Sequence, residues 1–78
     1  MFTIEHQRHG TLMHKFIVPE KNGEPLNQLI GFMLDSRLHT ALNRCQWEQH
    51  PLMSDVMVKH LVGSKGQPLG TLIAKRTQ

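Results

Sequence analysis

The sequence contains no tyrosine, one cysteine and only four aromatic residues, which are three phenylalanines and one tryptophan. Because Cys45 is the only cysteine, no intrachain disulfide can form, and a reducing compartment is favoured. The few aromatic side chains provide little material for a platform on which nucleic-acid bases stack. No apolar run reaches the length of a signal peptide or of a membrane-spanning helix. We therefore expect a cytoplasmic protein that makes no contact with a membrane.

Catalytic and metal-binding signatures are also missing. The glycines form no GxGxxG or GxxxxGK[ST] phosphate-binding pattern, and the serines lie in no nucleophile elbow. Cys45 falls on the apolar stripe of a predicted helix, where a free cysteine is usually a small buried hydrophobe. Six histidines are present without HExxH, paired CxxC or zinc-finger spacing. We expect no enzyme, no metal and no other cofactor.

The residues that are present suit one small folded domain. Hydrophobic residues make up 38% of the 78 residues and charged residues 19%, enough for a single modest core. The net charge of +3 lies in the second half, because residues 1–39 are balanced whereas residues 40–78 hold five basic and two acidic side chains. Such a surplus supports contact with phosphates or with an acidic protein surface. Because the core is small, we also expect a homodimer.

Period-two alternation predicts a β-hairpin at the start of the chain. The segments FTIEHQ and TLMHKFIV flank Arg8, His9 and Gly10, and the glycine suits a tight turn. Pairing of Gln7 with Thr11 predicts one set of core-facing side chains, namely Phe2, Ile4, His6, Leu12, His14, Phe16 and Val18. The opposite, outer set is Thr3, Glu5, Gln7, Thr11, Met13, Lys15 and Ile17.

The apolar period changes to about 3.6 residues after Pro25. Apolar side chains at i, i+3 and i+4 spacing from Leu26 to Cys45 predict one long amphipathic helix, with Pro25 at its favoured first position. The alternative makes LNQLIGFML a strand and begins a shorter helix at Asp35 or Ser36, both of which can cap a helix.

Residues 55–62, DVMVKHLV, alternate again and are rich in β-branched valine, so we predict a strand there. A helix from Pro51 to Val62 is the alternative, with Gly63 as its C-terminal cap. In the strand, Val56, Val58, His60 and Val62 share one face. Met57, Lys59 and Leu61 share the other face, which we assign to the outside of the sheet.

An internal similarity links the segments KNGEPLNQLI and KGQPLGTLI. Aligning residues 12–30 with residues 56–73, with one residue unpaired, gives 18 pairs of which nine are identical. This predicts a duplicated strand-and-turn unit, in which Lys15 and Lys59 both lie on the outer face. After the second turn, a C-terminal strand is favoured over a short terminal helix, because the sequence TLI is β-prone. One duplication is too short for a solenoid.

Together these elements predict a single α+β domain over residues 1–78. A small antiparallel sheet carries one long amphipathic helix on one face, in the order ββαβ with a fifth element as a C-terminal strand. We hypothesise a small basic, non-enzymatic, regulatory protein associated with nucleic acid, which binds through a basic helix face and lysine-bearing turns. The predicted nucleic-acid-binding residues are Arg37, Thr40, Arg44, Lys15, Lys59, Lys21, Lys65, Lys75 and Arg76.

The alternative hypothesis is a small protein-binding module, either an inhibitor or an adaptor. It would dock through apolar side chains on the outer face of the sheet, where there is no core to bury them. The predicted protein-interface residues are Met13, Ile17, Met57 and Leu61.

Overall fold

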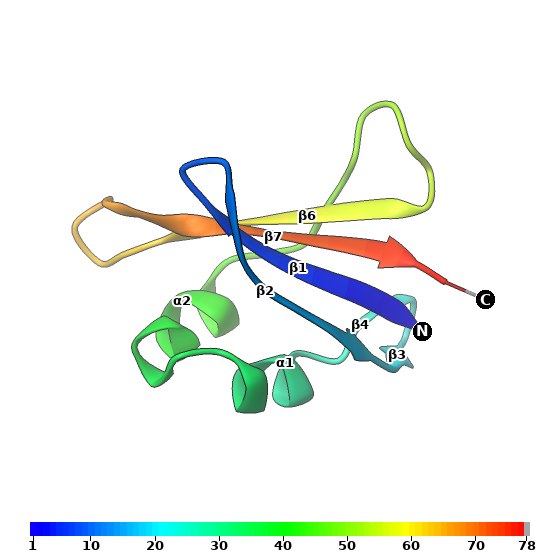
Figure 1. Cartoon of the computed structure of the whole chain (residues 1–78), viewed down its shortest axis with the longest axis horizontal. Helices are drawn as coiled ribbons and strands as arrows, with labels where there is room; N and C mark the ends of the chain where they lie inside the picture. Colours follow the sequence, from blue (N-terminus) through cyan, green and yellow to red (C-terminus); the bar gives the residue numbers. More distant parts are fainter. Residues whose placement is uncertain (78) are drawn as a thin grey trace.

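A computed structural model describes residues 1–77, and antiparallel sheet dominates it (Figure 1). Five strands pair in the order β2-β1-β7-β6-β5. Their bounds are β1 (Phe2–Arg8), β2 (Thr11–Val18), β5 (Glu48–Gln49), β6 (Val56–Val62) and β7 (Pro68–Arg76). A separate two-stranded sheet pairs β3 (Glu20–Lys21) with β4 (Glu24–Pro25). No helix in this described range is long and apolar enough to cross a membrane.

The prediction of one long helix on a small sheet is wrong. The helical region consists of short pieces, α1 (Asn27–Met33), the 3-10 helix η1 (Ser36–Leu38) and α2 (His39–Arg44). Leu34 is extended, with φ −97° and ψ 158°, and the Asp35 carboxylate then accepts a hydrogen bond from the Arg37 amide at the start of η1. The apolar period continues across this break because both helices pack on the same sheet face. The alternative located the second helical start correctly but wrongly made residues 26–34 a strand.

The predicted hairpin is present, but its register differs from the prediction. His9 and Gly10 have positive φ angles of 52° and 76°, as a two-residue type I′ turn requires. Gln7 pairs with Leu12, whereas His6 pairs with His14, so a bulge leaves one extra residue in β2 between them. The bulge turns the exposed Leu12 to the outer face, so its predicted core position is wrong.

The predicted strand at residues 55–62 is present as β6, but its faces are reversed. Lys59 and Leu61 are each 1% exposed and lie on the core side. Val58 and His60 occupy the outer side instead. The sequence could not resolve this orientation because apolar residues occur on both faces of β6. Lys15 and Lys59 are therefore not equivalent, since Lys15 is exposed on the outer face.

The hydrophobic core lies between the five-stranded sheet and the helices, which cover one face of that sheet (Figure 1). The strands and helices contribute Phe2, Ile4, Phe16, Val18, Ile30, Leu34, Ala41, Leu42, Leu61, Leu72 and Ala74. No helix among the described residues covers the opposite face. The sheet therefore has one apolar face, which the helices cover, and one mixed face, as is common in antiparallel sheets.

The two similar segments adopt different structures after their turns. KNGEPLNQLI forms the turn between β3 and β4 and the start of α1, whereas KGQPLGTLI forms the turn after β6 and most of β7. The predicted C-terminal strand is confirmed as β7, which lies between β1 and β6. The duplication itself stays a prediction from the sequence.

Candidate functional site

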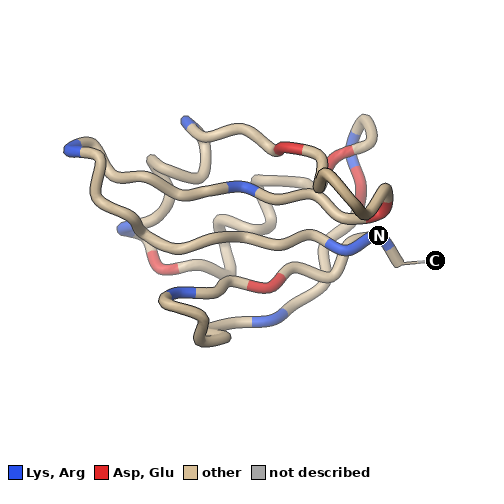
Figure 2. Tube along the Cα trace, turned by 90° about the horizontal axis from the view of Figure 1, so that it is seen from above, with Lys and Arg blue, Asp and Glu red and all other residues tan. Residues whose placement is uncertain are grey.

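The charged side chains are distributed unevenly along the sheet. Four basic residues and one acidic residue lie at the end of the molecule that carries the β1–β2 and β6–β7 turns (Figure 2). We call this the basic end and define it by Arg8, Arg37, Arg44 and Lys65, with Asp35 as its carboxylate. The rest of the chain holds five basic and five acidic residues. The whole net charge of +3 therefore resides at the basic end.

Two cations of the basic end are held by protein partners. Arg37 donates to both carboxylate oxygens of Asp35, with distances of 3.1 Å from Nε and 2.9 Å from Nη2. These hydrogen bonds lower the pKa of Asp35 from 3.8 to about 2 and raise that of Arg37. Arg44 donates to the carbonyl of Val62 at the end of β6. Both guanidinium groups are exposed despite these contacts.

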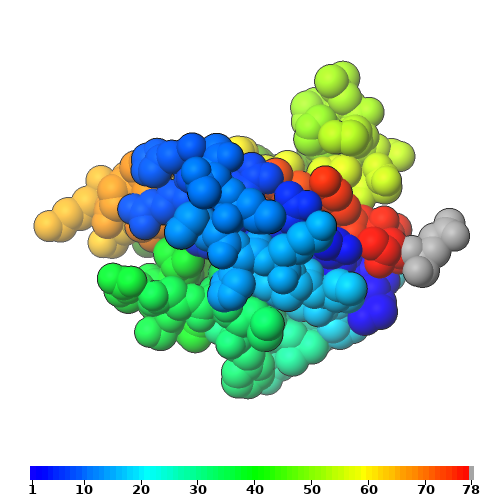
Figure 3. All heavy atoms as spheres, in the orientation of Figure 1, coloured from blue at the N-terminus to red at the C-terminus, as the bar shows by residue number. Residues whose placement is uncertain are grey.

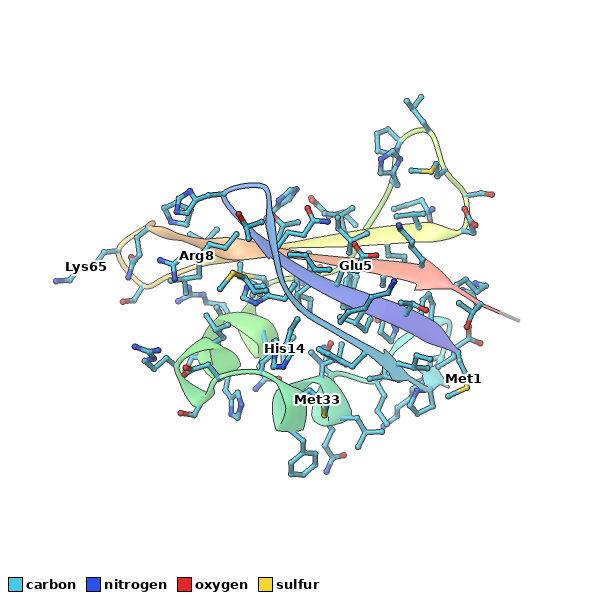
Figure 4. The ribbon with its side chains drawn as sticks, viewed as in Figure 1. Met1, Glu5, Arg8, His14, Met33 and Lys65 are labelled. Carbon is cyan, nitrogen blue, oxygen red and sulfur yellow. The ribbon has the colours of Figure 1, made fainter. Side chains whose placement is uncertain are left out.

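The other two cations of the basic end have no protein partner in the part of the chain that the structure describes. Within residues 1–77, the side chains of Arg8 and Lys65 form neither a hydrogen bond nor an ion pair. Both are exposed, and both lie at the same end of the sheet (Figure 4). Arg8 is at the last position of β1, and Lys65 is in the β6–β7 turn. These two side chains are therefore available to an anionic ligand without first breaking an internal contact.

An open groove of about 640 Å³ borders the basic end. It lies between the β1–β2 hairpin and the helical segment, which are both on the face shown in Figure 3. Its apolar lining consists of Met13, Met33, Leu34, Leu38 and Leu69. Its polar lining consists of His6, Arg8, His14, Asp35 and Arg37. The groove thus combines an apolar floor with arginine side chains at its edge.

The imidazoles of the groove are positioned by the hairpin. His6 is buried, and its Nε2 lies 3.3 Å from the carbonyl oxygen of Leu69. His14 is exposed and extends from β2 toward the helices, where Met33 lies (Figure 4). The His14 ring meets Phe16 edge-on, with ring centroids 6.1 Å apart. His14 therefore presents a flat surface beside the apolar floor.

A second hollow, of about 340 Å³, lies between the β1–β2 turn and the ends of β6 and β7. Arg8 lines this hollow as well as the groove, together with His9, His60 and Thr71. The guanidinium of Arg8 therefore stands between the two concave regions of the basic end. Arg8 is not among the residues selected from the sequence. The one signal for it was its position beside the predicted β1–β2 turn, which lies at the same end of the sheet as the β6–β7 turn.

The predicted nucleic-acid-binding residues do not form one surface. Arg37, Arg44 and Lys65 belong to the basic end, and Thr40 is exposed on α2 between the two arginines. Lys15 lies on the outer face opposite Glu5. The others lie elsewhere, with Lys21 and Arg76 near Glu20, Lys75 3.5 Å from Glu5, and Lys59 in the interior.

Lys59 is a structural residue rather than a surface cation. Its Nζ donates to the Leu42 carbonyl at 2.8 Å and to Asn27 Oδ1 at 3.3 Å, and it lies 4.8 Å from the centroid of the Trp47 ring. Trp47 donates to the same Asn27 oxygen at 3.1 Å. Burial lowers the pKa of Lys59, and Cys45 and Glu24 oppose this shift only in part. Lys59 therefore joins β6 to both helices, and its assignment to a binding surface is wrong.

The predicted protein-interface residues are also separated. Met13 lines the groove on the helical side, whereas Ile17 is exposed on the outer face. Met57 and Leu61 pack on the core side of β6. The predicted apolar outer face is therefore wrong as a unit. An exposed apolar group that the sequence analysis missed is present on α1, and it consists of Leu29, Phe32 and Met33.

The histidines do not gather into a metal-binding cluster. Within residues 1–77, no three side chains of the His, Cys, Asp and Glu types are placed so that they could hold a metal ion. His6 and His14 pair across the hairpin, and both line the groove. In the groove, these two imidazoles are flat, polar side chains that lie beside the apolar lining residues.

No protein-family model matches this chain, and neither a curated protein nor a solved structure shows a significant match. Functional inference therefore depends on the chemistry of the basic end and of the groove.

Proposed function

We propose that this protein is a small non-enzymatic, nucleic-acid-associated regulator that binds phosphates through its basic end. The observation that carries the proposal is the location of the whole net charge of +3 at Arg8, Arg37, Arg44, Lys65 and Asp35. A localised positive patch attracts a polyanion and releases its counterions. The patch spans two turns and a helical segment, so it offers several contact points along a phosphate backbone.

The partners of the four cations support unequal roles for them. Arg8 and Lys65 have no side-chain partner among the described residues 1–77, so they can bind a phosphate without breaking a contact made there. Arg37 shares its charge with Asp35, and Arg44 is oriented by the Val62 carbonyl. We expect Arg8 and Lys65 to contribute most of the electrostatic affinity. This is a backbone-directed mode, which fixes position without reading sequence.

The test measures binding of fluorescent mixed-sequence DNA and RNA between about 50 and 200 mM salt. The double variant Arg8→Ala/Lys65→Ala is expected to reduce the slope of log affinity against log salt by roughly 1.4 on a single strand. The control Lys15→Ala/Lys21→Ala also removes two positive charges, but from outside the basic end. It is expected to leave most of the slope of log affinity against log salt unchanged. Equal losses in both variants, or no binding at low salt, would contradict the proposal.

The exposed apolar group on α1 favours a second candidate function, that of a protein-binding adaptor or inhibitor. Phe32 is 76% exposed, and Leu29 and Met33 accompany it on the same short helix. Exposed apolar clusters of this kind are common at protein interfaces. A pull-down from the native cell extract, with and without nuclease, separates the two functions. Capture that survives nuclease and is lost in Phe32→Ser supports the adaptor.

A homodimer is part of the proposal, because a second copy would double the number of phosphate contacts and bury apolar surface. Multi-angle light scattering across a hundredfold range of protein concentration tests it directly. A mass near 18 kDa, twice that of the 9.0 kDa chain, is expected at high concentration. A mass of one chain throughout would refute the dimer without affecting the basic end.

A further inference from the structure

We propose that the groove beside the basic end accepts one unpaired base of a single-stranded nucleic acid, while the flanking phosphates contact Arg8 and Arg37. The inference rests on the proposed function and specifies the form of the ligand. Its basis is the juxtaposition of an apolar groove with the cationic side chains of the basic end. A nucleotide of a single strand has the matching chemistry, since it joins a flat ring, whose faces stack on apolar side chains and whose edge is polar, to a phosphate.

The size of the groove fits a ligand of this class. Its volume of about 640 Å³ falls within the range of about 300–1,000 Å³ in which small-molecule sites lie. Met33, Leu34 and Leu38 on one side come from the end of α1, the extended break after it and the end of η1, and Met13 and Leu69 close the other side. The apolar side chains on the helical side therefore come from one short stretch of the chain, beside a groove with room for a flat base. A helical peptide would need a longer groove, with apolar positions spaced over several turns.

The lining also explains how a base can be held by a chain with few aromatics. No Phe or Trp lines the groove, so an aromatic stacking platform is not its mode of binding. Methionine side chains are flexible and polarisable, and they adapt to flat ring surfaces. The imidazole of His14 is a flat aromatic side chain exposed beside them, and its edge-on contact with Phe16 favours one orientation. A base entering the groove would be covered by apolar side chains on one side and by His14 on another.

Charge at the groove edge selects an anionic ligand. Arg8 has no partner within residues 1–77, and Arg37 donates to Asp35 with an exposed side chain. A phosphate on either side of the bound base would find the Arg8 guanidinium free. The Asp35 carboxylate opposes phosphate binding at the Arg37 side, so the contact there exchanges one anionic partner for another. Arg8 is thus the main phosphate anchor beside the groove.

The bound base must be unpaired. In a duplex, the ring faces are stacked on neighbouring pairs, and extruding one base costs a few kcal/mol. A single strand presents its bases without this cost. The structure therefore predicts a preference for single strands over duplexes of the same sequence, in addition to the electrostatic binding that both forms share.

The experiment compares two 15-nucleotide oligonucleotides with equal phosphate number, one of oligo-uridine and one in which every base is replaced by an abasic sugar. Fluorescence anisotropy at low salt is expected to show about tenfold tighter binding of the oligonucleotide that carries bases. The variant Met13→Gln/Met33→Gln, which makes the exposed groove walls polar, is expected to remove this difference. The control Met53→Gln alters a methionine as exposed as Met33, at 46%, but outside the groove, and it keeps the difference.

The possible results separate this inference from the proposed function. Equal affinity for the two oligonucleotides, with a normal salt slope, would overturn base insertion while phosphate binding stands. Binding of neither oligonucleotide would overturn both. Tighter binding of a duplex than of a single strand would also overturn base insertion. Groove-dependent binding of an acidic amphipathic peptide, together with insensitivity to bases, would assign the groove to a protein ligand instead.

Circular dichroism and urea unfolding serve as folding controls for the groove variant. Met13 is 56% exposed and Met33 is 46% exposed, so replacement by glutamine is expected to leave stability nearly unchanged. If the double variant does not fold, the single variant Met13→Gln provides the same comparison. Loss of base preference in a folded variant, with unchanged binding of the abasic strand, locates the base in the groove.

Discussion

Replacing Lys59 by methionine tests whether a buried ammonium without a carboxylate partner stabilises this fold. Lys59 is 1% exposed, and no acidic side chain lies within ion-pair distance among residues 1–77. Its two hydrogen bonds contribute about 1.5–3 kcal/mol each, and its contact with Trp47 about 2 kcal/mol. Desolvation of the ammonium costs several kcal/mol. The favourable contacts of the ammonium and the cost of its desolvation nearly cancel, so the charge of Lys59 contributes little net stability at neutral pH.

Lys59→Met keeps the apolar stem but removes the charge and the donors. It leaves the Leu42 carbonyl without its lysine donor, so we expect a loss of about 1–2 kcal/mol in the free energy of unfolding. Lys59→Ala also removes three buried methylene groups, worth about 0.8 kcal/mol each, and is expected to cost about 4 kcal/mol. A domain of this size has a total stability of roughly 4–12 kcal/mol, so the alanine variant approaches unfolding. Urea denaturation at neutral pH measures both differences.

The pH dependence of the same comparison isolates the ammonium. Burial lowers the pKa of Lys59 in the folded protein below its unfolded value, so the charged form costs stability at and below neutral pH. As the pH rises through the folded pKa toward the unfolded value, this cost disappears. The wild-type protein should therefore gain stability relative to Lys59→Met between neutral pH and about pH 10. The difference between the two proteins should grow on the alkaline side.

Lys15→Met is the matched control, because Lys15 occupies the aligned position in the other of the two similar segments and is exposed. We expect its effect to stay within about 0.5 kcal/mol at every pH. An equal cost for Lys15→Met and Lys59→Met would refute the reasoning, because burial would then have no influence. A pH-independent difference between the wild type and Lys59→Met would refute the assigned pKa shift.

Three further predictions concern Asp35 and Gly70. Asp35→Asn removes one anion and frees the Arg37 side chain, so it should raise the affinity for a single strand several-fold in anisotropy measurements. Unchanged affinity would exclude Arg37 from phosphate binding. In the wild-type protein, the Asp35 carboxylate adds stability that is present above pH 3.8 and is lost as the pH falls toward about 2. The difference in unfolding free energy between the wild type and Asp35→Asn should therefore become smaller on acidification. Gly70→Ala should cost at least about 2 kcal/mol in urea denaturation, because φ is +114° and the added Cβ would lie 2.6 Å from Nε2 of His6. Gly66→Ala has a positive φ but open space, so an equal cost there would exclude the clash as the cause.

The strands could be predicted from the sequence because their signals are local. The turn at His9 and Gly10 has the positive φ angles that glycine accommodates, and the period of two on each side is set by the pleat. The helical region could not be predicted as it is, because Leu34 and Asp35 interrupt it with an extended conformation that leaves the apolar spacing intact. Periodicity reports which side chains face the sheet, and it does not report a change of direction between two short helices.

The orientation of β6 required tertiary information for a related reason. A strand with apolar residues on both faces has two nearly equivalent placements, and a lysine on one face argues for exposure. Lys59 nevertheless faces inward because the Leu42 carbonyl, Asn27 and Trp47 supply a polar cage that appears only when both helices are in place. Similarity between two segments does not imply similar surroundings in the fold, and for this reason the outer position predicted for Lys59 is wrong.

The basic end illustrates why the candidate site was only half predictable. Arg37, Arg44 and Lys65 were selected because a basic helix face and a lysine-bearing turn are visible in sequence. Arg8 and the groove were not, because the bulge in β2 places Met13 on the helical side, and because Arg8 lines one groove with Asp35 and Arg37 only in the folded chain. The proposed binding surface is assembled from three segments far apart in sequence, and the fold of the chain brings these segments together. Arg44 and Lys65 from the second half are thereby joined to Arg8 and Arg37 from the first half. Arg8, which has no partner within residues 1–77, lies at the edge of the groove.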